Sequence, residues 1–466
     1  MFFFLPSLPV AQIPEPAIVD RRFVTQTSEI RPLPGQLDRV LVFNSNSPEV
    51  VQTEGILLST FPTDGKAFPQ AHLNKPLVGR FDLFSHHIAR SSADRRSMYQ
   101  GLLVYNPNSE PVTIEVLQAV SYANNPDAPF IDLPTIVEDP IGSVFSGPGS
   151  RVMGEILRGK NQPNFPSKLI IPPQQTQMLF SLPILRSSGR TVFMRLQSSA
   201  PVYMANLAMY AIPNPIEISL EDINVFDTEN YLFPPPTYRE PTLEEWQNLL
   251  ISGRLAEPRD RPPIDPEKQD SEDLEKVFGR VAGVSIGSEW NTRITDRQGE
   301  KNLTIPTPGN AFSYPISTVN YITLGTRQVQ SAQMAVGYPD TALAAHGNYA
   351  VRYHLTLPLF NNSNTAKTVI LSMQTPFKQE NSRDRLFFVE PPQGQVFFRG
   401  TVRVNYIDDA GINQDKFYHL VQRQGQLGEP LVTLNIPPNQ VRQVTVDFLY
   451  PPDATPPQVV TVKTLP

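Results

Sequence analysis

The sequence predicts a mainly β protein with two related antiparallel β-sandwich domains, joined by a Pro-rich charged linker that contains one short helix. Three observations predict this fold class. Short apolar runs alternate with turn clusters, and helical periodicity is almost confined to one segment. The 49 prolines are spread through these runs, as expected of many short strands separated by turns. Finally, two phrases recur in the same order in each half of the chain.

The composition excludes several classes of protein. With 466 residues, the chain is long enough for two or three domains of ordinary size. Its formal net charge of −6 provides no basic field for nucleic acid or anionic lipid, so we expect no nucleic-acid partner. Cysteine is absent, which excludes disulfides, thiolate nucleophiles and cysteine zinc sites. We expect no cofactor.

The N-terminus begins with MFFFLPSLPVAQIPEP, an apolar run of signal-peptide length with Ala11 as a small residue at a cleavage position. We therefore expect residues 1–22 to be a residual signal peptide or N-terminal extension. The mature chain would then be extracytoplasmic, in the periplasm, at the cell surface or secreted. The alternative is an ordinary apolar N-terminal strand, because the basic start of a signal peptide is missing. The run is too short to span a bilayer, so we expect no transmembrane insertion.

An internal repeat predicts the two domains. The phrase LVYNPNSEPVTIEV (103–116) aligns with PLFNNSNTAKTVIL (358–371) at an offset of 255 residues. IPPQQ (171–175) aligns with IPPNQ (436–440) at an offset of 265 residues. Two matches in the same order indicate a duplicated domain, and the longer second offset indicates an insertion in the second copy.

The duplication sets the expected boundaries at residues 23–236 for the first sandwich and 277–466 for the second. The insertion is expected to hold a β-hairpin over residues 402–421, because a polar turn containing Gly411 separates two strand-like runs. A third phrase of the same kind, LVFNSNSPEVV, begins at Leu41 and has no counterpart 255 residues later. We expect it to form a further hairpin inside the first domain.

The segment between the repeats, 237–276, has the composition of a linker. In it 17 of 40 residues are charged, against 18% for the whole chain, and five are proline. One helix is expected inside it, because Thr242 and Glu245 have the spacing of a capping box and apolar residues follow at helical spacing. Trp246 on this helix is expected to pack on one of the sandwiches; binding of a partner is the alternative.

Gly283-Val284-Ser285-Ile286-Gly287 matches the G-x-S-x-G pattern of serine hydrolases, and Asp340 and His346 follow in the order of an α/β-hydrolase triad. The elbow of such an enzyme needs a strand that turns directly into a helix. The residues after Gly287 alternate and are rich in strand formers, so we expect a glycine-punctuated strand instead. Similarly, the glycines near Ser146 and Arg151 lack P-loop spacing and predict a turn with a solvated basic flank.

Four residues are candidates for a metal site: His72, Asp82, His86 and His87. Asp82 and His86 lie on one face of an expected strand, and His and Asp are typical ligands of zinc and other divalent ions. The alternative is a set of hydrogen-bonded histidines without metal.

Two aromatic residues, Trp290 and Tyr338, are candidate platforms for stacking on a sugar ring or base. The alternative is that they fill the core between two sheets, as most aromatic residues in alternating strands do. Carboxylates are numerous, but no pair stands out as an acid and base for glycoside hydrolysis.

Several phrases resemble an uncharacterised family of exported cyanobacterial proteins, a domain of unknown function. These phrases are Gly79-Arg80-Phe81-Asp82-Leu83-Phe84 with His86-His87, Pro258-Arg259-Asp260-Arg261, Phe312-Ser313-Tyr314-Pro315 and His346-Gly347-Asn348-Tyr349. The resemblance covers most of the chain. It implies an exported protein and assigns no residue a role.

We therefore expect an exported cell-envelope or extracellular protein with a structural or binding role and without catalysis. Recognition would use sheet faces and loops, with an envelope protein or a glycan as partner. The alternative is a glycan-binding module or a carbohydrate-active enzyme of the envelope. A metal-dependent hydrolase that uses the His and Asp candidates is a third hypothesis. The pattern leaves the oligomeric state open.

Overall fold

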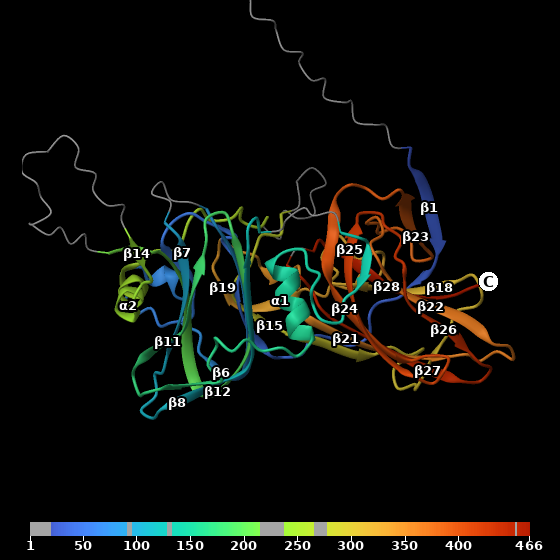
Figure 1. Cartoon of the computed structure of the whole chain (residues 1–466), viewed down its shortest axis with the longest axis horizontal. Coiled ribbons are helices and arrows are strands. Elements are labelled where there is room, and N and C mark those ends of the chain that lie inside the picture. Colours follow the sequence, from blue (N-terminus) through green and yellow to red (C-terminus); the bar gives the residue numbers. More distant parts are fainter. Residues whose placement is uncertain (1–19, 91–95, 128–132, 215–236, 265–276, 453) are drawn as a thin grey trace, which may run out of the picture.

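The computed structural model describes residues 20–90, 96–127, 133–214, 237–264, 277–452 and 454–466. Strands make up 49% of the chain and helices 6%, which confirms the expected mainly β fold. The strands form two masses side by side along the longest axis, named lobe 1 and lobe 2 by their sheets below (Figure 1). Nearly all of the expected signal peptide lies outside the described residues. None of the described helices is long and apolar enough to cross a membrane.

Lobe 1 is built around one sheet of twelve strands. The strands are β3 (Leu41–Ser45), β4 (Val50–Val51), β5 (Gly55–Ser59), β6 (Leu77–Ala89), β7 (Met98–Tyr105), β8 (Val112–Asn124), β10 (Lys168–Ile171), β11 (Thr176–Ile184), β12 (Gly189–Tyr210), β15 (Ala282–Ile286), β19 (Ala332–Gly337) and β20 (Ala344–Ala345). The main path of hydrogen-bonded neighbours runs β10-β8-β12-β6-β3-β15-β19-β20. Beside it, β7 pairs with β11 and β12, β5 pairs with β12, and β4 pairs with β6.

The long strand β12 organises lobe 1. Its first part pairs with β6 and β8, and its last part pairs with β7 and β5. The register against β6 shifts between Ser198 and Val202, so the strand bends there. Met194 in the first part and Met204 in the last part belong to one buried core. The single sheet thereby supplies both layers around this core.

Lobe 2 contains a seven-stranded and a five-stranded sheet. The first has β9 (Ile136–Glu138), β16 (Glu289–Arg293), β17 (Leu303–Thr304), β21 (Arg352–Phe360), β24 (Val396–Ile407), β25 (Asn413–Arg423) and β27 (Val441–Leu449). The second has β2 (Glu29–Ile30), β18 (Ala311–Ile316), β22 (Lys367–Gln374), β26 (Pro430–Ile436) and β28 (Gln458–Thr464). Alternate residues of both sheets, such as Leu357 and Leu371, meet in one core. Two small ribbons complete the strands: β1 (Arg22–Thr27) with β23 (Arg385–Glu390), and β13 (Ile212–Pro213) with β14 (Tyr238–Arg239).

Each lobe contains strands from both halves of the sequence. β15, β19 and β20 follow the expected linker, yet they complete the sheet of lobe 1. β1 and β2 lie near the N-terminus, yet they pair with β23 and β18. The residue pattern of a segment can show that it forms a strand, but it does not show which distant strand pairs with it. These pairings could therefore not be predicted from the sequence. The boundaries at 23–236 and 277–466 stay a prediction.

The repeated phrases occupy corresponding positions in the two lobes. In lobe 1, β8 pairs with β10 so that Ile114 faces Leu169. In lobe 2, β22 pairs with β26 so that Val369 faces Leu434, which are the residues at offsets of 255 and 265. The pairing of β11 with β7 agrees in register with that of β27 with β21 from Thr176 to Met178, where a bulge in β11 shifts it. The recurrence in sequence thus corresponds to a recurrence of strand pairing.

The two other hairpin predictions have different outcomes. The insertion forms the hairpin β24-β25 as expected, and Asp408 Oδ1 accepts hydrogen bonds from the backbone N–H groups of Ala410 and Ile412 in its turn, both at 2.9 Å. The hairpin expected at Leu41 is wrong. There, β3 and β4 both pair in parallel with β6 instead of with each other, so the chain does not reverse its direction between them.

Two helices are present in the described chain. α2 (Leu243–Ser252) begins after Thr242, whose hydroxyl accepts a hydrogen bond from Glu245 N while the Glu245 carboxylate accepts one from Thr242 N, as the capping box predicts. Trp246 of α2 is fully buried against lobe 1. α1 (Pro148–Leu157) lies between the lobes in Figure 1. Its Met153 packs in a cluster with Phe84 of lobe 1 and Leu449 of lobe 2.

Candidate functional site

The four metal candidates are not brought together as a ligand set. His86 and His87 are consecutive on β6 and therefore point to opposite faces of the sheet. His86 Nδ1 lies 2.8 Å from Thr191 Oγ1. His87 Nδ1 lies 2.7 Å from the Pro48 carbonyl oxygen. No group of three or more His, Asp or Glu residues that could hold a metal ion occurs in the described ranges.

The other two candidates are also engaged with protein groups. Asp82 is buried and forms an ion pair with Arg80. His72 Nδ1 lies 2.8 Å from Ser59 Oγ inside lobe 1. Burial lowers the pKa of His72 to about 4 and that of His87 to about 3, so both rings are neutral at pH 7. The arrangement matches hydrogen-bonded core histidines.

The two candidate platforms are buried. Trp290 is 4% exposed, and its indole Nε1 donates to the Pro34 carbonyl oxygen at 2.9 Å. Tyr338 is 3% exposed, and its hydroxyl donates to the Ala71 carbonyl oxygen at 2.7 Å. Neither ring therefore presents a face for stacking. The sequence shows that strand residues alternate, but it does not say which face of the strand meets the core.

Ser285 lies inside β15, which pairs with β3 and β19 and does not turn into a helix. The glycine-punctuated strand is therefore confirmed. The Asp340 carboxylate forms a bidentate ion pair with Arg259, at 2.7 and 3.0 Å. The basic residues near α1 differ in their surroundings. Lys160 is exposed, as expected of a solvated flank, whereas the guanidinium of Arg151 lies over the rings of Tyr122 and Phe145 and that of Arg158 lies over Phe417.

A cleft of about 730 Å³ lies between the lobes and is the best candidate for a binding site. Lobe 1 supplies residues of β3 and β6, and lobe 2 supplies residues of β24 and the segment around Pro456. Two loops, 277–281 and 345–349, complete the wall. Segments far apart in the sequence therefore meet at this cleft.

Two asparagine side chains give the cleft its most unusual property. Phe43 of β3 points into the core of lobe 1, so Asn44 points the opposite way, into the cleft. Asn46 follows β3 and is fixed by its backbone N–H, which donates to the Val281 carbonyl oxygen at 2.8 Å. Both side chains are 4% exposed, and neither Oδ1 has a hydrogen-bond partner in the described part of the chain. A buried acceptor in this condition costs about 1–3 kcal/mol.

The charged groups of the cleft are unequal in number. Arg261, Arg280, Lys378 and Arg399 line it, together with the carboxylates Glu49 and Asp260. Arg280 NH2 lies 2.5 Å from Glu49 Oε2, and Asp260 accepts a hydrogen bond from the Glu49 backbone N–H at 3.1 Å. Lys378 is exposed and forms no ion pair with any described residue. Arg261 and Arg399 each have a partner of their own, so Lys378 is the charged group of the cleft that is most available to a ligand.

Aromatic and neutral polar groups form the rest of the wall. The rings of Phe278 and His346 lie 4.9 Å apart, and both are half-buried. Burial lowers the pKa of His346 to about 4, so its imidazole is neutral at pH 7 and adds no charge. The half-buried Tyr349 hydroxyl donates to the Ala454 carbonyl oxygen at 3.1 Å. Apolar ring surface thus adjoins hydrogen-bonding groups.

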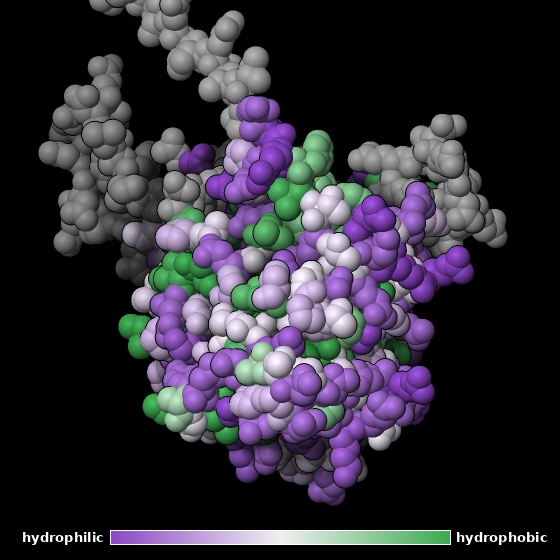
Figure 2. All heavy atoms as spheres, turned by 90° about the vertical axis from the view of Figure 1, so that its right-hand side faces the viewer, coloured by the Kyte–Doolittle hydropathy of each residue, from purple (hydrophilic) through white to green (hydrophobic). Residues whose placement is uncertain are grey.

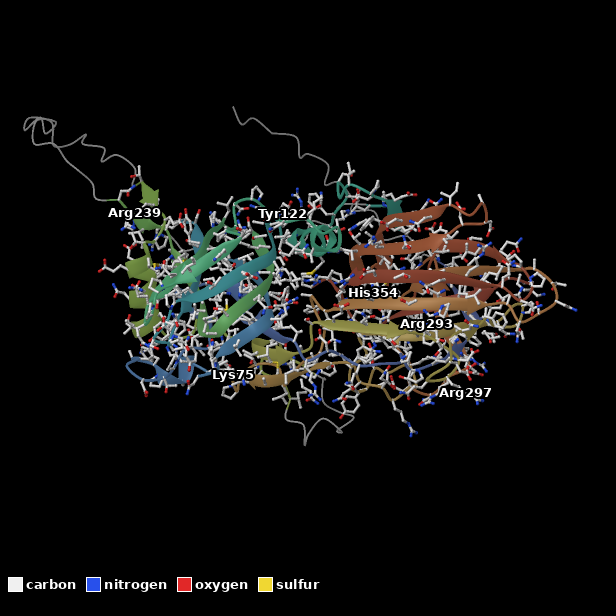
Figure 3. All side chains as sticks on the ribbon, turned by 90° about the horizontal axis from the view of Figure 1, so that it is seen from below. Lys75, Tyr122, Arg239, Arg293, Arg297 and His354 are labelled. Carbon is white, nitrogen blue, oxygen red and sulfur yellow. The ribbon has the colours of Figure 1, made fainter. Side chains whose placement is uncertain are left out.

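A second pocket, of about 200 Å³, lies on the seven-stranded sheet beside His354, which Figure 3 labels in lobe 2. Arg352 binds the buried Asp447 carboxylate at 2.8 and 2.5 Å. Burial alone would raise the pKa of Asp447, but the hydrogen bonds from Arg352 lower it overall. Asp447 and Arg403, the other charged residue of this pocket, each form an ion pair within the described chain, and the pocket is much smaller than the cleft, so it is the weaker candidate.

Sequence reasoning missed Asn44 and Asn46. The available signal was the run Asn44-Ser45-Asn46-Ser47, which continues a strand that is otherwise apolar and central in its sheet. Polar residues in a buried strand need partners, and this requirement marks them as structural or functional. Their proximity to Lys378 and His346 depends on the docking of the lobes, which has no local signal.

The fold and the cleft define a mainly β protein with an open polar site between two strand-rich lobes. The chain belongs to the family described as protein of unknown function (DUF3370), whose sequence profile matches residues 28–464. The expected resemblance to a family of unknown function is thereby confirmed. The cyanobacterial source and the export that the resemblance implied stay predictions. A search among curated proteins gives no match.

Solved structures give no further argument about the fold. Pumpkin seed globulin is 11% identical, covers 81% of this chain and 76% of its own, and has a TM-score of 0.09. Procruciferin, an 11S globulin from Brassica napus, is 10% identical with coverages of 92% and 84% and a TM-score of 0.10. Coconut allergen cocosin is 9% identical with coverages of 84% and 84% and a TM-score of 0.10.

Proposed function

We propose that this chain is an exported, non-catalytic protein of the cell envelope or extracellular space, and that it binds a ligand in the cleft between its lobes. The observation that carries the binding role is the pair of buried amide oxygens of Asn44 and Asn46, which have no partner in the described chain. Each such group costs free energy until a ligand or water satisfies it, and the position of these two on the wall of the cleft favours a ligand.

Further observations support the other parts of the proposal. The matching strand registers of the two lobes support two related β-sandwich domains. The apolar N-terminal run supports export. Figure 2 shows the lobe 2 end of the molecule, where hydrophobic residues form small separate areas among hydrophilic ones. This face offers no broad apolar surface for a protein partner.

The engaged carboxylates of the cleft favour binding over catalysis. Glycoside hydrolysis needs two carboxyl groups placed on either side of the scissile bond, one of them as a proton donor. Glu49 is held by Arg280, and Asp260 accepts the Glu49 backbone N–H. Neither carboxylate is disposed to act on a substrate. The second candidate function is therefore a glycan-binding module, which the half-buried rings of Phe278 and Tyr349 in the cleft favour.

The binding role is tested by affinity capture from envelope fractions that include glycan components, with the full chain and its Asn46→Leu variant immobilised. Leucine is close to asparagine in size and removes the unpartnered acceptor, so the variant should unfold at the same temperature or a higher one. We expect the variant to lose captured material that the native chain and the exposed-site control Asn362→Leu both retain. Equal capture by all three proteins contradicts the proposal. Export is tested separately by cell fractionation, and a full-length chain confined to the cytosol contradicts it.

A further inference from the structure

We infer that the ligand of the cleft is an acidic carbohydrate, that is, a sugar whose hydroxyls meet Asn44 and Asn46 and whose anionic group meets Lys378. This inference rests on the proposed binding function and names its ligand class. It follows from three properties of the wall: unpartnered acceptors, an ammonium group without an ion pair among the described residues, and apolar ring surface.

The acceptors require a ligand with O–H or N–H donors. An amide Oδ1 accepts hydrogen bonds only, so a ligand that carries only acceptors would leave Asn44 and Asn46 unsatisfied. The two acceptors, one on β3 at Asn44 and one just after it at Asn46, both lie on the wall of the cleft and suit a ligand with several hydroxyls. The neutral imidazole of His346 adds a further hydrogen-bonding group without charge.

The ammonium group of Lys378 favours an anionic ligand. Arg280 is already neutralised by Glu49 at 2.5 Å. Lys378 is exposed at the cleft, its ammonium carries three donors, and it has no ion pair among the described residues. A carboxylate or phosphate on the ligand would accept a charge-assisted hydrogen bond from the Lys378 ammonium. A cationic ligand would meet like charge and is disfavoured.

The position of β3 favours a sugar over an acidic peptide. Extended peptides commonly bind by adding a strand to an exposed sheet edge, where backbone N–H and C=O groups are unpaired. β3 is a central strand with β6 on one side and β15 on the other, so its backbone groups are already used. Recognition at this wall must use side chains. The ring of Phe278 offers the apolar surface on which the C–H face of a sugar can pack.

The test compares matched ligands by isothermal titration calorimetry on the full chain. Glucuronate and glucose differ by one carboxylate, and glucose 6-phosphate replaces the carboxylate by a phosphate. Inorganic phosphate and acetate supply an anion without a sugar, and an acetylated Asp-Glu peptide supplies anions and amide donors. We expect one or both acidic sugars to bind on the order of tenfold more tightly than glucose, and the simple anions to bind more weakly than either.

Two variants separate the parts of the inference. Lys378→Gln should bring the affinity of the acidic sugars down to that of glucose. The control Lys301→Gln removes the same charge from an exposed site outside the cleft, so it should keep the preference for acidic sugars. Asn46→Leu should weaken the binding of acidic and neutral sugars alike, because the hydroxyl acceptor is common to both.

The possible failures are distinguishable. If glucose and glucuronate bind equally in the native chain and Asn46→Leu removes both, the acidic ligand class is wrong and the proposed function stands. If the acidic peptide binds and none of the sugars does, the carbohydrate class is wrong and a binding function still stands. If none of the six probes binds and Asn46→Leu captures the same envelope material as the native chain, both the inference and the proposed function are overturned.

Discussion

Asn106 and Asn361, 255 residues apart, make the same hydrogen bonds in the two lobes. Each Nδ2 donates to the carbonyl oxygen four residues later, at 2.7 and 2.8 Å, and to that of the isoleucine beginning the Ile-Pro-Pro phrase, at 3.0 and 2.8 Å. Each Oδ1 accepts the backbone N–H two residues later. Both side chains are fully buried. In each lobe one asparagine thus closes a turn and hydrogen-bonds the Ile-Pro-Pro segment beside it. This explains why the asparagine phrase and the Ile-Pro-Pro phrase recur together.

We predict that Asn106→Ala and Asn361→Ala each lower the free energy of unfolding by roughly 2–3 kcal/mol, because each leaves buried carbonyl and N–H groups without partners. Urea denaturation measures the change. The two side chains lie in different lobes, so the double variant should lose the sum of the single losses. Asn362→Ala, at an exposed position of the same turn, should change stability by less than about 0.5 kcal/mol. A negligible loss at either buried asparagine contradicts the shared role.

The indole ring of Trp246 on α2 packs directly against Gly101 of β7. A Cβ at this glycine would lie 2.6 to 2.8 Å from atoms of the indole ring. We predict that Gly101→Ala destabilises the protein by about 1–3 kcal/mol and displaces α2. Tryptophan fluorescence should shift to the red in a Trp290→Phe background, which leaves Trp246 as the only tryptophan. Gly394→Ala is the control, since open space surrounds that glycine; an unshifted spectrum for Gly101→Ala means that α2 docks differently.

The elements predicted from sequence are those whose determinants lie close together in the chain. The capping box of α2 spans Thr242 to Glu245, and the β24-β25 hairpin is specified by its own turn and flanking strands. The docking of β3 between β6 and β15 was not predicted, because it joins segments about 40 and 240 residues apart whose local patterns are ordinary strands. The cleft depends on the same docking. Asn44 could therefore be recognised only as a polar residue in a buried strand.

The protein should lose stability when the pH falls below about 6.5. Burial lowers the pKa of His72, His346 and His419 to about 4 and that of His87 to about 3, whereas an unfolded histidine titrates near 6.5. Between these values the unfolded chain binds protons that the folded chain does not, so acid favours unfolding. The fully buried His87 alone contributes a slope of about 1.4 kcal/mol per pH unit.

This dependence is measured by urea denaturation at pH 7, 6 and 5. The variant His87→Gln should reduce the slope of stability against pH, whatever its effect on stability at pH 7. Comparison of slopes separates the titration from the packing cost of the substitution. Stability that is independent of pH from 7 to 5 in the native chain contradicts the buried, neutral state of these histidines.

Acid should weaken the stabilising effect of the Arg352–Asp447 ion pair in the native chain, and it should reduce the loss of stability that Arg352→Met causes. In the native chain Arg352 holds the pKa of Asp447 below 3.8, so this pair stabilises the fold above that pH and loses its contribution as the pH falls further. Arg352→Met leaves a buried carboxylate uncompensated, at a cost of about 3–5 kcal/mol near pH 7. Removal of the arginine should raise the carboxyl pKa, so acid should then diminish the loss.

The double variant Arg352→Met/Asp447→Leu should recover most of the stability, because no buried charge remains. An equal loss in the single and double variants at pH 7 would mean that packing of the arginine, and not the charge of Asp447, sets the cost.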